Sequence, residues 1–431
     1  MKRHPILLGA LVLTTACGPG SDASPDSGVV AFTGATVWDG TGSPPLEDAT
    51  LLVDAGRVVS LGTDVEIPQG ATEIDLAGTF VTPGLVNAHG HVSGRWAHAD
   101  VSDEIRRVYG DLELFARYGV TTVNSLGDGE VVLAAKDSAS PMATRARLRA
   151  AGPVITASDP EEAREAAEAN ATAGADWLKL RVDDNLGTTE KMPWDAVTAV
   201  LEVGEARHIP VATHVFYLED ARRLLSMGTD MIAHSVRDVA VDEGFVEQLR
   251  ASGACYVPTL TRELSTFVYA DRPDFFDDPF FTRHALATEV ERLSEPDFMA
   301  AMSESRAAAG YREALNRALE NLIVLAEAGV AIGMGTDAGP PGRFPGYFEH
   351  LELWMMVDAG MTPEEALRSA TSVAARCARV DDVGTLEPGK WADFLVFAEN
   401  PLEDIERTRS LERVYVAGET MEEVPPGSPG R

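Results

Sequence analysis

Two histidines separated by a single residue end an apolar run in the first quarter of the chain. The run reads Val-Thr-Pro-Gly-Leu-Val-Asn-Ala from residue 81, and His89 and His91 follow it with Gly90 between them. Side chains two residues apart in a strand point to the same face, so the two imidazoles face one side. Imidazole nitrogens are common zinc ligands, and the pair therefore predicts part of a metal site.

Further residues suited to metal chemistry stand in or directly after later apolar runs; they are Lys179, His214, His234 and Asp337. We expect the first histidine pair and Asp337 to hold one divalent ion, zinc, and the two later histidines to hold a second. A lysine on an apolar strand loses its proton easily. Its neutral amine can take up carbon dioxide as an anionic carbamate, which would bridge the two ions. Water activated by the ions would then act as the nucleophile.

Lys179 has two other interpretations that the residues leave open. A lysine in a strand can form a Schiff base with a carbonyl substrate, as in a metal-free aldolase. It can also form an ion pair, here with Asp183 or Asp184. The histidine pair could likewise cap backbone groups at a strand end.

The candidate residues fall into an alternation of strand-like and helix-like segments. Residues 160–173, 194–207, 218–227 and 313–328 have helical spacing and are rich in Ala, Glu, Arg and Leu. Apolar, β-branched runs lie at residues 80–88, 119–125, 153–157, 177–182, 210–213, 230–233, 254–260 and 330–336. This pattern predicts an α/β fold with a (β/α)8 TIM barrel, whose active site lies at the carboxyl ends of the strands.

Both flanks of this region read as short strands without long helices. The runs lie at residues 29–38, 49–53, 57–61, 72–76, 394–397 and 411–416. We expect a small β-sandwich domain composed of residues 29–80 and 382–424, with the barrel, residues 81–381, inserted between them. Residues 261–296 break the alternation and carry six aromatic side chains. They predict either a lid over the site or a helical excursion that packs its own aromatics.

The N-terminus resembles a bacterial lipoprotein signal peptide over residues 1–16, with a charged start, a short apolar core and lipidation of Cys17. An ordinary secretory signal cleaved nearby is the alternative. Residues 17–28, rich in Gly, Ser, Pro and Asp, predict a flexible tether. We expect a protein of the bacterial envelope that faces the periplasm and touches the membrane only through its lipid anchor. Gly18 after the cysteine resembles the sorting signal for the outer membrane.

The net charge and the cysteine content give further information on the partners and on the state of the thiols. The formal net charge of −32 over 431 residues argues against a nucleic-acid partner, because phosphate binding needs a basic surface. Cys255 and Cys377 are too few for a disulfide framework, and we expect two buried free thiols.

Several motifs together resemble the amidohydrolase superfamily. They are Pro83-Gly-Leu-Val-Asn-Ala-His-Gly-His91, Ala175-Asp-Trp-Leu-Lys179, Thr213-His214, Ala233-His234, Gly335-Thr-Asp337-Ala-Gly339 and the segment from Gly384 to Val396. The lysine-bearing strand resembles the imidazolonepropionase-like and prolidase-like subgroup with a carboxylated lysine. The resemblance implies two divalent metal ions and hydrolysis of a C–N bond in a small amide, cyclic amide or dipeptide. It also implies that Asp337 is the catalytic residue, which takes the water proton and passes it to the leaving nitrogen.

Substrate contacts are expected from side chains near the strand ends; the candidates are His98, Tyr217, Arg237, Arg343 and His350. An arginine among them suits bidentate binding of a carboxylate. Two other functions remain open: a mononuclear deaminase or imidazolone-type hydrolase, and a non-catalytic binding protein of the envelope. Substrate specificity in such a barrel lies in its loops, so the sequence does not predict the substrate. It does not predict the oligomeric state either.

Overall fold

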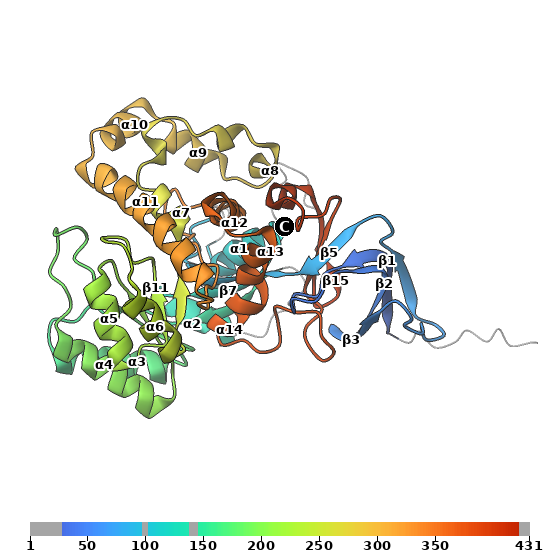
Figure 1. Cartoon of the computed structure of the whole chain (residues 1–431), viewed down its shortest axis with the longest axis horizontal. Coiled ribbons are helices and arrows are strands. Elements are labelled where there is room, and N and C mark those ends of the chain that lie inside the picture. Colours follow the sequence, from blue (N-terminus) through green and yellow to red (C-terminus); the bar gives the residue numbers. More distant parts are fainter. Residues whose placement is uncertain (1–27, 97–101, 138–144, 422–431) are drawn as a thin grey trace, which may run out of the picture.

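The computed structural model describes residues 28–96, 102–137 and 145–421 and confirms the α/β class. Figure 1 shows a β-sheet at one end of the molecule beside a larger part in which helices surround further strands. The predicted signal peptide, the tether up to residue 27, Cys17 and His98 lie outside the described residues. No helix in the described ranges is long and apolar enough to cross a membrane.

Strands from both ends of the chain pair in one mixed sheet. β5 (Phe80–Pro83) pairs in parallel with β1 (Val30–Val37) and antiparallel with β13 (Phe394–Phe397). The path of pairing runs β15-β14-β13-β5-β1-β2-β3, with β4 beside β1. The other strands are β2 (Leu46–Asp54), β3 (Arg57–Gly62), β4 (Thr72–Asp75), β14 (Leu411–Val416) and β15 (Glu419–Thr420). The sequence predicts a sandwich here, whereas these eight strands are joined into a single sheet around its own core, which includes Phe32, Phe394 and Tyr415.

Seven parallel strands form the second set. Three belong to one sheet: β6 (Leu85–Gly90), β7 (Val120–Ser125) and β8 (Arg147–Ala150). Four belong to another: β9 (Leu178–Arg181), β10 (Val211–His214), β11 (Met231–Ala233) and β12 (Cys255–Val257). These strands are short and, except for β8, almost fully buried, as expected for parallel strands covered on both faces.

Three links connect the two parallel sheets. A parallel bridge pairs Ile155, just after β8, with Leu180 of β9. On the other side, Tyr256 of β12 bridges in parallel to Ile332, in the run at residues 330–336. Two residues farther along, the Met334 carbonyl accepts a hydrogen bond of 2.9 Å from the Ala88 N–H of β6. The run predicted as the eighth strand therefore lies between β12 and β6.

Two strand predictions need correction. The run at residues 80–88 is two strands, because the chain leaves one sheet for the other at Gly84. A Cβ at Gly84 would lie 2.2 Å from Thr121 Oγ1, so no larger residue fits this crossing. The third parallel strand is β8 and not residues 153–157. The sequence pattern does not indicate β8, because Arg147 and Arg149 alternate with its apolar residues. Arg147 pairs with Asp393 and Arg149 with Asp176, so both charges are neutralised.

The predicted helices are confirmed. The longest, α11 (Arg306–Glu327), begins at Arg306, earlier than the predicted start at residue 313. Asp159 caps α3 by accepting the N–H groups of residues 161 and 162, and Pro160 stands at its first position. The helices between and after the parallel strands are α1 (Glu104–Arg117), α2 (Glu130–Asp137), α3 (Pro160–Thr172), α4 (Trp194–Arg207), α5 (Leu218–Met227), α6 (Glu243–Ser252), α11 (Arg306–Glu327), α12 (Tyr347–Ala359), α13 (Pro363–Arg368) and α14 (Ala374–Cys377).

The segment after β12 is a helical excursion built on aromatic packing. It contains α7 (Leu260–Leu264), η1 (Val268–Ala270), η2 (Asp274–Asp277), α8 (Pro279–Thr282), α9 (Ala287–Leu293) and α10 (Pro296–Ser303). Phe276 stacks on Phe281 with ring centroids 5.5 Å apart, and Phe281 meets Tyr347 of α12 edge to face at 4.9 Å. The aromatics therefore anchor the excursion to α12, which favours the packing interpretation of this segment.

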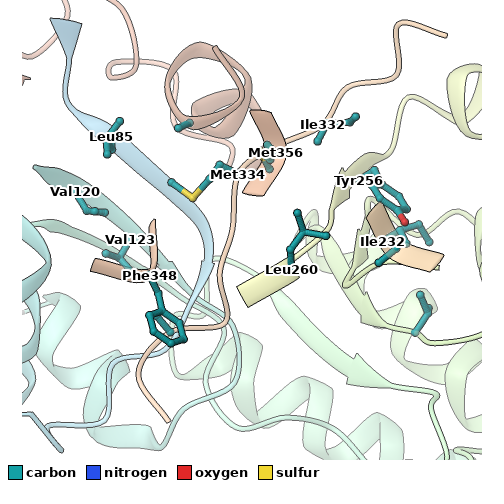
Figure 2. Packing of buried hydrophobic residues seen from close by; sticks show 14 of the residues in the cluster. Leu85, Val120, Val123, Ile232, Tyr256, Leu260, Ile332, Met334, Phe348 and Met356 are labelled. Carbon is teal, nitrogen blue, oxygen red and sulfur yellow. The ribbon is translucent and has the colours of Figure 1, made fainter. Parts of the chain in front are cut away.

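The main hydrophobic core lies among the parallel strands and draws on distant parts of the chain. Figure 2 shows Leu85 and Val120 from the first sheet, Ile232 and Tyr256 from the second, and Met334 from the run between them. All five side chains are buried. This shared core fixes the strand ends relative to one another, which is what a site made from several strands requires.

The two described cysteines contradict the prediction of free thiols, because Cys255 and Cys377 form a disulfide. Cys255 begins β12 and Cys377 ends α14, 122 residues later. Nothing in the local sequence of either residue reveals a neighbour at that separation. The bond ties α14 to the strand array.

Candidate metal centre

The predicted metal ligands converge at the carboxyl ends of the parallel strands. His89 and Lys179 lie near the ends of β6 and β9, His214 is the last residue of β10, and His234 directly follows β11. Asp337 follows the run that lies between β12 and β6 and donates its backbone N–H to the His89 carbonyl over 2.7 Å. The structure therefore brings these five side chains to one end of the strand array.

Two histidines and one aspartate form a compact ligand group. In His89, His91 and Asp337, one nitrogen or oxygen atom of each lies within 4.8 Å of the others. Asp337 Oδ1 is 2.6 Å from His91 Nε2 and 3.6 Å from His89 Nε2. His89 and Asp337 are buried and His91 is half-buried. This is the ligand set that the sequence predicts for the first ion.

The charge balance of this group fits a bound cation. Burial opposes a proton on His91, but Asp128 and Asp337 outweigh it and raise the pKa of His91 to about 10. Burial would also raise the pKa of Asp337, yet Arg343 and His91 hold it well below its usual range. Two carboxylates thus stabilise positive charge at the His91 ring, where a divalent ion can replace the proton.

Two further histidines face each other beside this group. The ring centroids of His214 and His234 are 4.0 Å apart, and those of His234 and His89 are 4.6 Å apart. Burial lowers the pKa of His214 to about 3 despite Asp183, and burial with the neighbouring His214 lowers that of His234 well below its usual value. Both imidazoles are therefore neutral at pH 7, which is the state that binds metal.

Each of these histidines has one ring nitrogen occupied by a protein oxygen. His214 Nε2 lies 2.6 Å from Asp183 Oδ2, and His234 Nδ1 lies 2.6 Å from Thr259 Oγ1. Among the described residues, no hydrogen-bond partner is found for the other ring nitrogens, Nδ1 of His214 and Nε2 of His234, so both can serve as ligands. A fixed partner on one nitrogen sets the orientation of the ring.

Lys179 lies inside the group. Its Nζ is 3.3 Å from His89 Nε2, and its side chain is 2% exposed. Burial lowers the pKa of the ammonium to about 7, although the Asp337 carboxylate opposes this. Among the described residues, the carboxylate that acts on Lys179 is Asp337, whereas Asp183 contacts His214 and Asp184 accepts a hydrogen bond from Tyr217, so the predicted ion pair with Asp183 or Asp184 is not formed.

Sequence reasoning missed the side chains that orient the ligands. Asp128 lies three residues after β7, places Oδ1 3.2 Å from His91 Nδ1, and accepts the Val92 N–H over 2.8 Å. Thr259 lies two residues after β12 and plays the corresponding part for His234. Both residues lie just beyond the carboxyl end of a strand, and this position could have marked them as candidates for the site.

The backbone is strained at three of these positions. His234, Thr259 and Asp337 adopt left-handed conformations, with φ of 74°, 52° and 57°. Such conformations cost about 1–3 kcal/mol each in non-glycine residues and concentrate at functional sites. They turn the side chains at three neighbouring strand ends into the common space.

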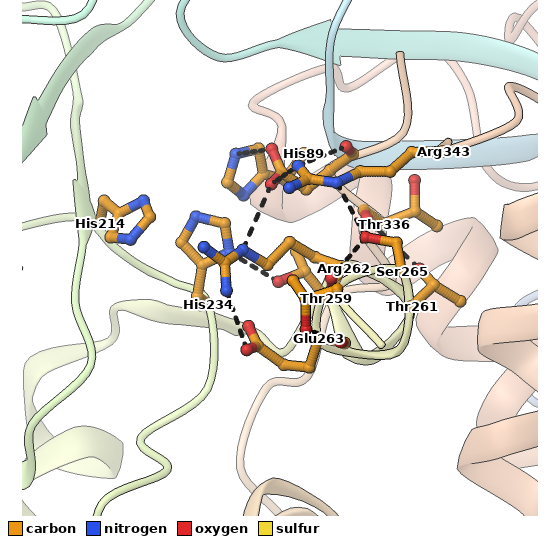
Figure 3. A network of polar contacts seen from close by, with 12 residues as sticks. His89, His214, His234, Thr259, Thr261, Arg262, Glu263, Ser265, Thr336 and Arg343 are labelled. Atoms are coloured by element: carbon orange, nitrogen blue, oxygen red, sulfur yellow. Dashed lines mark hydrogen bonds and ion pairs between the residues drawn. The ribbon is translucent and has the colours of Figure 1, made fainter. Parts of the chain in front are cut away.

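An arginine network borders the ligand group on the side of the helical excursion, and Figure 3 shows Arg262 and Arg343 extending from separate segments toward the histidines. Arg343 Nη1 bonds Asp337 Oδ2, and Arg262 Nε lies 4.0 Å from the same oxygen. Glu263 accepts from Arg262 over 2.9 Å and pairs with Arg237 at 3.1 Å. Two of these arginines, at 237 and 343, are among the predicted substrate contacts.

The other predicted contact residues lie in different surroundings. Tyr217 donates to Asp184 over 2.8 Å and stands under the ammonium of Lys191. His350 is fully buried in α12, where Nε2 lies 2.7 Å from the Tyr118 carbonyl and the ring meets Phe280. That placement favours a packing role for His350.

A surface hollow of about 1100 Å³ lies away from the ligands. It is lined by residues that precede strands, among them Asp176 before β9, Pro210 before β10 and Asp230 before β11. These belong to the amino ends of the strands. Its cationic groups Arg149 and Arg379 are already paired, with Asp176 and Asp230. We therefore place the chemistry at the ligand group.

Known proteins resemble this chain over most of its length. A model described as the amidohydrolase family matches residues 80–421. Imidazolonepropionase of Deinococcus radiodurans is 26% identical over 398 residues, which cover 86% of this chain and 92% of that protein. Ochratoxinase of Aspergillus niger is 24% identical over 419 residues, covering 84% and 79%. A solved Xaa-Pro dipeptidase, 21% identical, covers 91% of this chain and 100% of its own with a TM-score of 0.72, a likeness of fold.

Proposed function

Because this chain belongs to the amidohydrolase family, we propose that it is a metal-dependent hydrolase that cleaves the C–N bond of an amide, a cyclic amide or a dipeptide. The observation that carries the proposal is the convergence of His89, His91 and Asp337 at the strand ends. The names of the relatives, imidazolonepropionase, ochratoxinase and Xaa-Pro dipeptidase, describe small-molecule or dipeptide substrates and support this class.

We propose two zinc sites that share Lys179. His89, His91 and Asp337 would hold one ion, and the free nitrogens of His214 and His234 would hold the other. The Lys179 amine, neutral in part at pH 7, would attack carbon dioxide, lose a proton and become an anionic carbamate between them. The spacing of His89, His234 and His214, with ring centroids 4.6 and 4.0 Å apart, supports such adjacent sites. Bound zinc supplies Lewis acidity and lowers the pKa of water.

The side chains of the protein would then manage the proton. Asp337 would accept it from the attacking water and deliver it to the leaving nitrogen, so that the amine departs neutral. Arg343 donates to the Oδ2 of Asp337 and leaves Oδ1 facing His91. This contact would hold the carboxylate in one orientation through the cycle.

The test is metal analysis combined with hydrolysis of a panel of N-acyl amino acids, dipeptides and lactams. We expect bound zinc, loss of activity with a chelator and recovery with added zinc. Asp337→Asn should fold but lose activity, whereas Asp297→Asn, an exposed change in α10, should keep its activity. Hydrolysis that persists in fully metal-free protein would refute the proposal.

A mononuclear hydrolase or deaminase is the second candidate. One observation favours it: within the described residues, the compact ligand group contains only His89, His91 and Asp337. Such an enzyme would bind one metal ion per chain and, as a deaminase, release ammonia. Metal stoichiometry and an ammonia assay separate it from the two-metal enzyme.

For the fold, we propose a closed (β/α)8 barrel of residues 84–381 and a second domain formed from both ends of the chain. The three links between the parallel sheets support closure, since β6 to β12 and the run at residues 330–336 follow chain order around a ring. Small-angle scattering of the purified protein would test this arrangement.

For the location, we propose a lipid-anchored envelope protein exposed to the periplasm. The disulfide between Cys255 and Cys377 supports an oxidising compartment, because disulfides are rare in the bacterial cytosol. Fractionation tests this: the wild type should sediment with outer membranes, and Cys17→Ser should not. Recovery of the wild-type protein in the cytosolic fraction would refute this location.

A further inference from the structure

A buried carboxylate lies one hydrogen-bonded residue away from the metal ligands. Glu349, in the first turn of α12, is 0% exposed, and the groups that bond it among the described residues are all neutral. Burial raises the pKa of its carboxyl to about 7, although these donors oppose the shift. A buried carboxylate without a cation beside it costs stability. A residue that is kept at this cost is expected to serve the function of the protein.

The two oxygens of Glu349 have different partners. Oε2 accepts the Gly346 N–H over 2.7 Å and so caps the start of α12. Oε1 accepts from two side chains, Asn87 Nδ2 at 2.5 Å and Thr336 Oγ1 at 2.6 Å. These two donors lie 249 residues apart in the chain. Oε1 therefore joins β6 to the run that ends before Asp337.

Asn87 connects this oxygen to the first histidine. It lies two residues before His89 in β6, and its Oδ1 accepts the His89 N–H over 2.9 Å. Its amide nitrogen donates to Glu349 and also lies 2.9 Å from Thr336 Oγ1, so both of its hydrogens have acceptors and the amide has one orientation. The backbone at His89 is therefore held through Asn87 by Glu349.

Thr336 connects the same oxygen to the aspartate. Its Oγ1 donates to Glu349 and accepts the Ala338 N–H over 3.0 Å, so the hydroxyl spans Asp337. Asp337 has a left-handed φ of 57°, which the surrounding contacts must maintain. Because Glu349 takes the hydroxyl hydrogen, the oxygen of Thr336 is left as an acceptor that holds this turn.

We propose that Glu349 is a positioning residue of the metal centre, which fixes the segments carrying His89 and Asp337 so that both can bind the first ion. This rests on the proposed function. A binding site functions only when its side chains are held within about 0.5 Å of the productive geometry. Partners outside the ligands typically change metal affinity by about 10- to 100-fold.

The experiment measures the zinc affinity of Glu349→Met by titration against a chelator of known affinity. It is done at pH 8, where the Glu349 carboxyl of the wild type is largely ionised. Methionine has a similar length and accepts neither donor, so the link between Asn87 and Thr336 is lost. We expect the affinity to fall by about 10-fold or more. The stabilisation of the protein by zinc against heat should shrink with it. An affinity equal to that of the wild type overturns the inference.

Glu365→Met is the matched control for the capping role. Glu365 occupies the same third position in α13 and accepts the Thr362 N–H over 2.8 Å, but its side chain is exposed. This variant should lose helix capping and keep the zinc affinity of the wild type. An equal fall in affinity in Glu365→Met and Glu349→Met would assign the effect to capping and overturn the inference.

A change at Thr336 tests the link while Glu349 stays in place. Thr336→Val keeps the branched shape and lacks the hydroxyl, and it should bind zinc about 10-fold more weakly. Thr336→Ser keeps the hydroxyl and should bind like the wild type. In Glu349→Met combined with Thr336→Val, the two losses should not add, because both variants break one link. If Glu349→Met fails to fold, the comparison of Thr336→Val with Thr336→Ser decides, and equal affinities overturn the inference.

Zinc binding and hydrolysis together separate this inference from the proposed function. A wild type that binds zinc and hydrolyses a substrate, with unchanged affinity in Glu349→Met, overturns the inference and leaves the proposed function intact. A wild type that binds zinc but hydrolyses nothing on the panel, with weaker binding in Glu349→Met, supports the positioning role and contradicts the hydrolase.

Discussion

Asp128 holds His91 from behind: its Oδ1 lies 3.2 Å from the ring Nδ1, while the opposite ring nitrogen faces Asp337. The same carboxylate accepts the backbone N–H of the next residue, Val92, and a bond from the Ser125 hydroxyl. It therefore fixes both the ring and the chain that carries it. Carboxylates in this position orient metal-binding histidines and increase their basicity.

Removing that charge should weaken metal binding. We expect Asp128→Asn to lower zinc affinity by about 10- to 100-fold, because His91 loses its orienting carboxylate. Titration against a chelator of known affinity measures this without any substrate. Glu130→Gln, an exposed change in the first turn of α2, should bind zinc like the wild type. An unchanged affinity in Asp128→Asn would show that the contact is only structural.

Lys179 should decide whether there are two metal ions. In Lys179→Met, a buried apolar side chain of similar length replaces the amine, and the bridge cannot form. We expect loss of one ion and a fall in activity of about 100-fold or more, since changes to outer partners alone cost about 10–100-fold. Metal analysis of the purified variant provides the count, and Lys390→Met in the loop before β13 is the control.

The carbamate itself has a separate test. Metal-free wild type reconstituted with zinc in buffer depleted of carbon dioxide should regain little activity, and added bicarbonate should restore it. If Lys179→Met keeps both ions, or if reconstitution ignores bicarbonate, Lys179 does not bridge the site.

The sequence predicts which side chains meet at the strand ends and misses the residues that support them, for a physical reason. His89, His214 and His234 are found because a parallel strand presents its last side chains at one end of the array. Asp128 and Arg262 lie on connecting segments, whose course depends on contacts distant in sequence. The local pattern around them contains no such information.

The same reason explains the errors in the fold. Arg147 and Arg149 made β8 look polar, because their partners, Asp393 and Asp176, are visible only after folding. The split at Gly84 was hidden within one continuous apolar run, because both strands are buried. Apolar periodicity reports burial and does not say in which sheet a strand is buried.

The disulfide should contribute substantially to stability. Replacing both cysteines, Cys255→Ala with Cys377→Ala, should lower the free energy of unfolding by about 2–5 kcal/mol, because the bond closes a long loop in the unfolded chain. Thermal unfolding with and without a reductant measures the effect. The wild type should lose stability on reduction and approach the double variant, which should not respond. A wild type indifferent to a reductant that demonstrably opens the bond would contradict this.

Glu352 should make stability depend on pH. Burial raises its pKa to about 8, although Thr261 and the backbone of α7 oppose the shift. A carboxyl with a raised folded-state pKa stabilises most below its unfolded value of about 4.5, and this contribution is lost as pH rises through about 8. Between pH 5 and pH 8, denaturant unfolding should therefore show a steeper loss of stability in the wild type than in Glu352→Gln. Glu313→Gln, exposed on α11, should follow the wild type. Parallel curves for the wild type and Glu352→Gln would mean that Glu352 is ionised in the folded protein throughout this range.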